Sequence, residues 1–329
     1  MKIVIAGGSG QVGTVLARAF HGGGDDVTVL SRAPKPASWK VKRWGLSSTE
    51  GWWEELEGAD VLINLAGRSV NCRYTPKNRK EIHNSRVNSV RVLGEAVSRT
   101  RRPPPVWLQM STATIYAHTY GGPNDESGVI GGNEPNVPDT WRFSIAVATS
   151  WEKAFDEVST PATRKVKLRS AMVMSPDRGG VFSTLLWLVR HGLGGTMGDG
   201  RQYVSWIQEQ DFVRAVKFLI ERDDIDGVVN LASPNPESNG EFMAHLREAW
   251  GRSFGLPATK WMLEIGALFL RTETELILKS RRVVPGRLLR EGFTFDYPEW
   301  KGAAKELCER WRHGQHQTIV VPSGVKQRA

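Results

Sequence analysis

The sequence is poor in cysteine, and it has no long apolar run. The two cysteines, Cys72 and Cys308, exclude a disulfide framework and lack the spacing of metal ligands. Glycines arrive too soon after Met1 for a secretory signal. The most apolar later segment, residues 261–270, contains Glu264 and is too short to cross a bilayer. These absences predict a cytoplasmic protein that does not enter a membrane.

Motifs for nucleic-acid binding and for hydrolysis are also missing. The net charge is +9, from 44 Lys and Arg against 35 Asp and Glu, but the basic residues are scattered along the chain. No zinc finger, RNA-recognition motif or helix-turn-helix accompanies them. The sequence has neither a G-x-S-x-G nucleophile elbow nor an H-E-x-x-H zinc motif. The positive charge therefore favours an anionic small molecule over nucleic acid, and we expect no metal.

The chain does begin with the pattern of a dinucleotide-binding turn. Residues 3–5 form a β-branched run, three glycines follow as G-x-x-G-x-x-G, and an amphipathic segment begins at Thr14. Gly7 permits a tight turn, Gly10 lets the backbone approach a pyrophosphate, and Gly13 lets helix and strand pack closely. The first N–H groups of the helix and its dipole then face the phosphates. This order of strand, turn and helix predicts a nucleotide site.

No Asp or Glu follows the second predicted strand, residues 25–31. An NAD site commonly places an acid there, where it binds the ribose 2′-hydroxyl. Here the strand ends in Ser31 and Arg32, with Lys35 close behind. An acid would repel a 2′-phosphate, whereas a guanidinium pairs with it. The sequence therefore predicts NADP(H) rather than NAD(H).

Strands and helices alternate along most of the chain. Further strands are predicted at 41–44, 60–67, 106–111, 164–170 and 227–231, and helices at 51–56, 76–98, 141–158, 181–191 and 211–221. This alternation predicts an α/β fold with a doubly wound parallel sheet, the NAD(P)-binding Rossmann fold.

The pattern changes after residues 175–180, which read Ser-Pro-Asp-Arg-Gly-Gly. Helices are predicted at 240–251, 260–270 and 299–312, with a short strand at 293–297. We expect residues 1–170 plus 204–232 to form the NADP-binding domain. Residues 171–203 plus 233–312 would form a smaller, mainly helical substrate-binding domain, and 313–329 a flexible tail.

Several ordered motifs extend the pattern across the chain. They are Asn64-Leu-Ala-Gly67, Ser85-Arg-Val-Asn88, Trp151-Glu152, Gly192-Leu-Gly-Gly195, Gly198-Asp-Gly-Arg-Gln202, Ser205-Trp-Ile207, Arg282-Val-Val-Pro285 and Glu291-Gly-Phe-Thr-Phe295. With these motifs the sequence resembles the extended short-chain dehydrogenase/reductase superfamily as far as about residue 312. Within it, the sequence is similar to the sugar-nucleotide epimerase-like branch, which has a C-terminal domain of unknown function.

The resemblance implies a set of site residues. The cofactor would lie against Gly7, Ser9, Gly10, Gln11, Val12, Gly13, Ser31, Arg32, Leu65, Ala66, Gly67, Asn88 and Ser111. Thr112 matches the hydroxyl residue of the superfamily's catalytic set. Three arginines, Arg169, Arg201 and Arg282, resemble positions that face the second domain and its ligand.

One departure concerns the chemistry itself. The superfamily carries Tyr-x-x-x-Lys on the helix before strand 164–170, where the Lys lowers the pKa of the Tyr so that it can exchange protons. Here, counting back from Glu152 leaves either Phe143 and Val147 or Ser144 and Ala148 in those positions. Neither pair transfers a proton at neutral pH.

Two further matches to the superfamily also fail. A chance Tyr-x-x-x-Lys at 297–301 lies beyond the sheet strands, so we reject it. Arg281 stands where relatives typically carry Gln, so the substrate side departs from the family's pattern.

Substitute proton donors and two functions stay open. Tyr116 could act in catalysis or pack at a strand end, and Asp125 and Glu126 could act or be solvated acids of the 121–139 loop. The first function is an NADP(H)-dependent oxidoreductase or epimerase using Thr112 and Tyr116 on an anionic small molecule, with nucleotide-linked compounds included. The second is a non-catalytic NADP(H)-binding sensor. A homodimer is a possible assembly.

Overall fold

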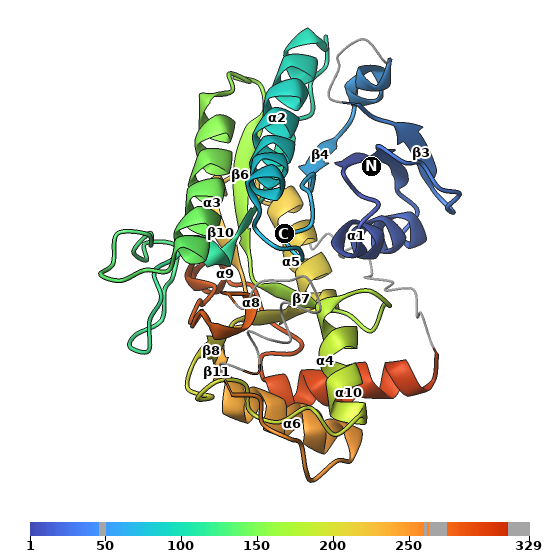
Figure 1. The fold of residues 1–329 in the computed structure, drawn as a ribbon. Helices are drawn as coiled ribbons and strands as arrows, with labels where there is room; N and C mark the ends of the chain where they lie inside the picture. The colour runs from blue at the N-terminus through green and yellow to red at the C-terminus, as the bar shows by residue number, and fades with distance from the viewer. Residues whose placement is uncertain (46–50, 260–261, 263–274, 315–329) are drawn as a thin grey trace.

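A computed structural model describes residues 1–45, 51–259, 262 and 275–314. Its centre is a sheet of seven parallel strands in the order β10-β6-β5-β4-β1-β2-β3 (Figure 1). The strands are β1 (Lys2–Ala6), β2 (Asp26–Ser31), β3 (Lys40–Arg43), β4 (Val61–Asn64), β5 (Val106–Thr112), β6 (Arg164–Ser170) and β10 (Gly227–Leu231). The predicted doubly wound α/β fold is confirmed.

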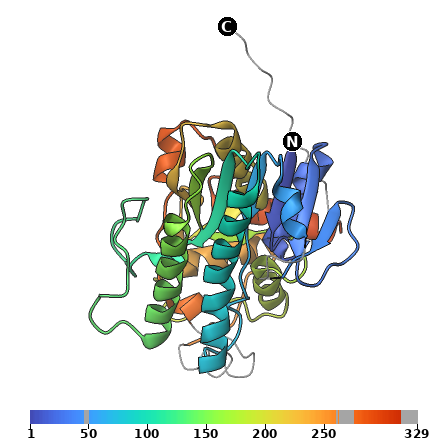
Figure 2. The same cartoon turned by 90° about the horizontal axis from the view of Figure 1, so that it is seen from above.

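Helices cover both faces of this sheet, as the apolar strands require. Ile3 and Ile5 pack with α1 (Gln11–Gly22) and α5 (Glu209–Glu221) in one core cluster. Val4, between them, packs with α2 (Pro76–Arg99) and α3 (Asp139–Glu157) in another. Figures 1 and 2 show α2 and α3 side by side. Because successive side chains of a strand point to opposite faces, the single run at 3–5 supplies both cores.

The strand order reverses between β1 and β4, and this places a ligand crevice. β1 pairs with β2 on one side and with β4 on the other, with Ile5 opposite Val29 and Ile63. The chain leaves β1 and β4 toward opposite faces of the sheet, so their carboxyl ends are not covered by a shared connection. Ligands in such sheets bind at this switch point.

The C-terminal part lies below the sheet in Figure 1. Its main helices are α4 (Val181–Arg190), α6 (Asn239–Trp250) and α10 (Trp300–Arg312). They enclose a separate core in which the rings of Phe242 and Trp300 stack 4.1 Å apart. The other elements of this part of the chain are short: β7 (Met172–Met174), β8 (Tyr203–Val204), β9 (Trp206–Gln208), β11 (Glu237–Ser238), α8 (Glu275–Leu278) and α9 (Gly286–Arg290).

The structure corrects two local predictions. The helix expected at 51–56 is a 3₁₀ turn, η1 (Trp52–Leu56), and a second such turn, η2 (Ala113–Ile115), follows β5. The strand expected at 293–297 is wrong. There the Phe293 ring meets Phe218 and Phe295, and the N–H groups of Asp296 and Tyr297 each donate to the Asp211 carboxylate at 2.8 Å. A buried carboxylate thus takes the place of a strand partner.

Some predictions fall outside the described residues, namely most of helix 260–270 and the tail from 315 onward. The division into two domains stays a prediction. In the described part of the chain, no helix is both long and apolar enough to cross a membrane.

Candidate cofactor and substrate site

The glycine turn after β1 is built so closely that side chains cannot enter it. Gly7 has φ +73°, and a Cβ there would lie 2.6 Å from the Cα of Ala66. A Cβ on Gly13 would lie 2.4 Å from the Cα of Gly8. Both contacts are shorter than real Cβ contacts, so only glycine lets β1, β4 and α1 approach each other in this way.

Gly10 differs, because a Cβ there would meet nothing within 4 Å. It is the N-cap of α1, and the first turn of that helix carries no acidic residue. The first N–H groups of a helix have no partner inside the helix. Ser9 beside it is exposed, whereas Gln11 packs against Gly180. Open space over unpaired N–H groups, without a nearby acid in that turn, fits a pyrophosphate.

Among the described residues, the carboxyl ends of β2 and β3 carry positive charge only. Arg32 follows β2, is exposed, and has no hydrogen bond or ion pair within the described ranges. Arg43 ends β3 opposite Ser31 and is also exposed. Lys40 and Lys42 are different, since they pair with Glu55. These two exposed guanidinium groups fit a 2′-phosphate better than a ribose hydroxyl.

Asn64 shapes the turn between β4 and the crevice. Its amide donates to Gln109 Oε1 at 2.9 Å and to Ser89 Oγ at 3.2 Å, and its Oδ1 accepts the N–H of Ala66 at 3.0 Å. The Asn64-Leu-Ala-Gly67 motif is therefore a fixed turn. It brings Ala66 against Gly7, as the expected cofactor contacts at 65–67 require.

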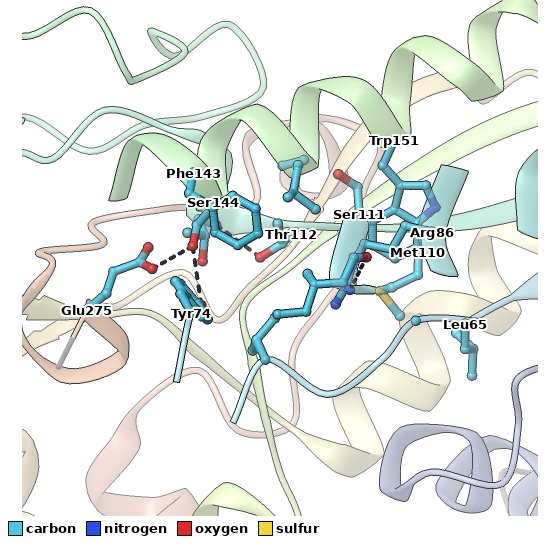
Figure 3. A pocket seen from close by; sticks show the side chains of 16 residues that line it. Leu65, Tyr74, Arg86, Met110, Ser111, Thr112, Phe143, Ser144, Trp151 and Glu275 are labelled. Atoms are coloured by element: carbon cyan, nitrogen blue, oxygen red, sulfur yellow. Dashed lines mark hydrogen bonds between the residues drawn. The ribbon is translucent and has the colours of Figure 1, made fainter. Parts of the chain in front are cut away.

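A pocket of about 220 Å³ opens where β4 and β5 end, between α2 and α3 (Figure 3). Four of the predicted site residues line it, namely Leu65, Gly67, Ser111 and Thr112. Thr112 is half-buried, and its Oγ1 accepts the N–H of Thr114 at 3.2 Å. The cofactor crevice and the predicted catalytic hydroxyl thus meet at one pocket.

All four α3 residues considered for the Tyr and Lys positions line this pocket: Phe143, Ser144, Val147 and Ala148. Ser144 is the polar one, and its Oγ donates to Glu275 Oε2 at 2.5 Å. Sequence reasoning missed Glu275, because it comes from α8, 131 residues further along the chain.

Arg86 is a second missed pocket residue. Its Nη1 donates to the carbonyls of Arg68 and Ile82, and its guanidinium lies 5.1 Å from the centre of the Trp151 ring. Burial lowers the pKa of Arg86 to about 10, so it stays charged at neutral pH.

Within the Ser85-Arg-Val-Asn88 motif, Arg86 lines the pocket, whereas Asn88, the residue predicted to contact the cofactor, does not. Ile82, Arg86 and Ser89 share one face of α2, which helical phase could have indicated. Asn88 is half-buried, does not line the pocket, and makes no hydrogen bond within the described part of the chain.

Tyr116 and Arg169 are hydrogen-bonded to each other and do not line this pocket. The Tyr116 hydroxyl donates to Asn230 Oδ1 at 2.8 Å and accepts from Arg169 Nη1 at 3.0 Å. Arg169 also makes two hydrogen bonds of 2.8 Å to Glu152. Burial raises the pKa of Tyr116. Neither residue lines the pocket that holds Thr112, and both groups are hydrogen-bonded inside the protein.

The loop acids and the two other arginines lie away from the pocket lining. Glu126 accepts the N–H groups of Asn230 and Arg287, which fastens the 121–139 loop, and Asp125 caps Ser127. Arg201 lies over the ring of Tyr120, and Arg282 over that of Tyr203. Over the described ranges, no cluster of three or more His, Cys, Asp or Glu side chains could hold a metal ion.

The comparisons with known proteins agree with this architecture. The model of the NAD dependent epimerase/dehydratase family matches residues 3–232, and a domain of unknown function, DUF1731, matches 258–307. The chain belongs to the NAD dependent epimerase/dehydratase family. The resemblance drawn from the motifs is confirmed.

Individual relatives cover nearly the whole chain. Human epimerase family protein SDR39U1 is 29% identical over 310 residues, which is 93% of this chain and 99% of the relative. A Staphylococcus haemolyticus epimerase family protein is likewise 29% identical, over 94% of this chain and 99% of its own length. The crystal structure of human SDR39U1 with NADPH has a TM-score of 0.80 at 28% identity, covering 94% of this chain and 99% of that one. That NADPH agrees with the predicted cofactor.

Proposed function

We propose that the protein is an NADP(H)-dependent oxidoreductase or epimerase-like enzyme that acts on an anionic small molecule, nucleotide-linked compounds included. One observation carries the proposal: the pocket that holds Thr112 is also lined by Leu65 and Gly67, which flank the Ala66 that lies against Gly7 in the glycine turn. A dinucleotide on that turn would bring its reactive end to this pocket. The NADPH bound to human SDR39U1 supports the choice of cofactor.

Each part of the site has a distinct task in this proposal. The turn from Gly7 to Gly13 and the start of α1 bind the pyrophosphate, and Arg32 binds the 2′-phosphate. Arg86 adds positive charge beside Gly67. Thr112 orients the reacting oxygen of the substrate. The nicotinamide, when bound, supplies the hydride chemistry.

A non-catalytic NADP(H)-binding sensor is the second candidate. The observation that favours it is the apolar lining of α3, where Phe143, Val147 and Ala148 occupy positions considered for the family's proton-transferring pair. A fold shared with enzymes does not establish activity.

One experiment separates these functions. NADPH and NADH are titrated against the wild type and Arg32→Ala, and we expect the variant to lose at least tenfold in NADPH affinity, about 1.4 kcal/mol, with little change for NADH. NADPH-loaded protein is then mixed with a panel of carbonyl and sugar-nucleotide compounds in single turnover. Turnover that Thr112→Val abolishes and Thr149→Val preserves supports the enzyme, since Thr149 is exposed on α3. Tight binding without turnover, with a partner recovered only in the presence of NADPH, supports the sensor.

A further inference from the structure

Ser144 stands at one of the α3 positions where the family's proton-transferring residue belongs, and it does not stand alone. Its hydroxyl donates to Glu275 Oε2 at 2.5 Å, and the hydroxyl of Tyr74 lies 3.4 Å from Ser144 Oγ. Figure 3 shows the three side chains gathered at one end of the pocket, with Arg86 and Trp151 at the other. They come from three separate segments: the loop before α2, α3 and α8.

Glu275 is well placed to exchange a proton with a molecule in the pocket. Its side chain is buried, with 1% of the residue exposed, and it lines the pocket. The guanidinium of Arg281 lies 3.6 Å from Oε1. Arg281 is itself held by a hydrogen bond from Nε to Thr114 Oγ1 at 3.1 Å. This geometry places a fixed positive charge beside the carboxyl group of Glu275, whose carboxylate form is the one that acts as a base.

We propose that Glu275, acting through Ser144, is the acid–base group of this pocket, in place of the Tyr and Lys that α3 lacks. The inference rests on the proposed function, because it needs NADP(H) as the hydride partner. It also narrows the substrate to a compound with an alcohol or a carbonyl at the reacting carbon. The pocket of about 220 Å³ is below the roughly 300–1,000 Å³ of pockets that enclose drug-sized ligands, so the reacting part is compact.

The step balances in both directions. In oxidation, the O–H proton of the substrate moves to Ser144 Oγ while the proton of Ser144 moves to Glu275 Oε2. The C–H bond of the same carbon breaks, its electron pair leaves with the hydrogen as hydride to NADP⁺, and the C=O bond forms. The products are the carbonyl compound, NADPH and a protonated Glu275. Reduction runs the same transfers backward.

The test compares Glu275→Gln, Glu275→Asp and Ser144→Ala with the wild type. The matched control is Glu248→Gln, an exposed glutamate of α6 paired with Lys301. Single-turnover rates are measured with NADP⁺ and a panel of compact alcohols, and with NADPH and the matching aldehydes and ketones. We expect Glu275→Gln to slow the step at least about 100-fold, within the range of lost general acid–base catalysis. Glu275→Asp should recover part of the rate, and the control should match the wild type.

Two readouts do not depend on rate. The dissociation constant of NADPH should change by no more than about twofold in every variant, which corresponds to about 0.4 kcal/mol of binding free energy. Difference infrared spectra during alcohol oxidation should show a protonated carboxyl appearing in the wild type and the control, but not in Glu275→Gln. If Glu275→Gln does not fold, the single-turnover rate of Ser144→Ala, a smaller change, decides the test.

Each outcome decides something. Wild-type turnover that Glu275→Gln leaves within about threefold would overturn the role of Glu275 and leave the proposed function standing. A wild type that binds NADPH but converts no compound overturns both the enzyme and this pair. A wild type that fails to bind NADPH refutes the proposed function at its first step.

Discussion

Arg169 and Glu152 are joined by two hydrogen bonds of 2.8 Å, one from Nε to Oε1 and one from Nη2 to Oε2. The pair is buried, and Ser111 adds a third bond to Glu152 Oε1 at 2.6 Å. Burial works against the charge of Arg169, but the bonds to Glu152 and Tyr116 outweigh it and raise its pKa. This network ties α3 to β5 and β6 through Ser111, which lines the pocket next to Thr112.

Breaking this pair should be costly. Glu152→Gln leaves a buried guanidinium without its counterion, and we expect the free energy of unfolding to fall by about 3–5 kcal/mol. Urea denaturation with an unchanged m value measures it. Glu157→Gln is the control, because Glu157 lies on the same helix in an exposed pair with Lys153 and should change stability by less than about 0.5 kcal/mol. Equal effects of the two changes would contradict a structural role for the buried pair.

Gly10→Ala should separate cofactor binding from folding. A Cβ meets nothing at this position in the free protein, so the melting temperature should stay close to that of the wild type. The same Cβ would stand where a pyrophosphate approaches the backbone, and we expect NADPH affinity to fall at least tenfold, about 1.4 kcal/mol. Gly302→Ala, in open space on α10, is the control and should leave NADPH binding unchanged. Undiminished NADPH affinity in Gly10→Ala would argue against the glycine turn as the phosphate site.

Arg86→Met should weaken NADPH binding without lowering the stability of the free protein. The guanidinium pays a desolvation cost, visible in its lowered pKa, and it donates to backbone carbonyls rather than to a carboxylate. Removing the charge should keep or raise the melting temperature of the free protein and weaken NADPH binding about tenfold or more, since a charge-assisted contact is lost. Calorimetry measures both. Arg91→Met, on the exposed side of α2, should change neither the melting temperature nor the NADPH affinity. An Arg86→Met protein that binds NADPH as tightly as the wild type would exclude a role of Arg86 in cofactor binding.

Lys279 should make stability depend on pH. Burial is the main cause that lowers the pKa of Lys279 to about 8, and the nearby Arg281 lowers it further. Between about pH 8 and 10.5 the unfolded chain then binds more protons than the folded one. The contribution of Lys279 to stability therefore rises with pH across this window, by up to about 1.4 kcal/mol per pH unit.

Lys279→Met tests this sign. The difference in unfolding free energy between variant and wild type should favour the variant more at pH 7.5 than at pH 9.5. Denaturation at the two pH values, with exposed Lys153→Met as the control, measures it. A difference that does not change with pH would show that Lys279 titrates normally.

Local patterns were enough to predict most of the sheet. The run at 3–5, the glycines after it and the apolar stretch before Asn64 each specify a strand or a turn through neighbours only a few residues away. Such strands are apolar on both faces, which is the signature of a covered parallel sheet. The missing acid after β2 likewise predicted the type of cofactor, because that position is set by its distance from the glycine turn.

The partners of charged side chains were decided only by tertiary structure. Arg169 could have faced a ligand, but packing of α3 on β6 brings Glu152 to it. Ser144 looked inert on its own helix, and it gains a carboxylate only because α8 reaches the pocket from 131 residues away. Composition and periodicity show which segments are apolar and where the chain turns. They do not indicate which distant charged residue lies within 3 Å of a given side chain, because that depends on how whole helices and strands pack against each other.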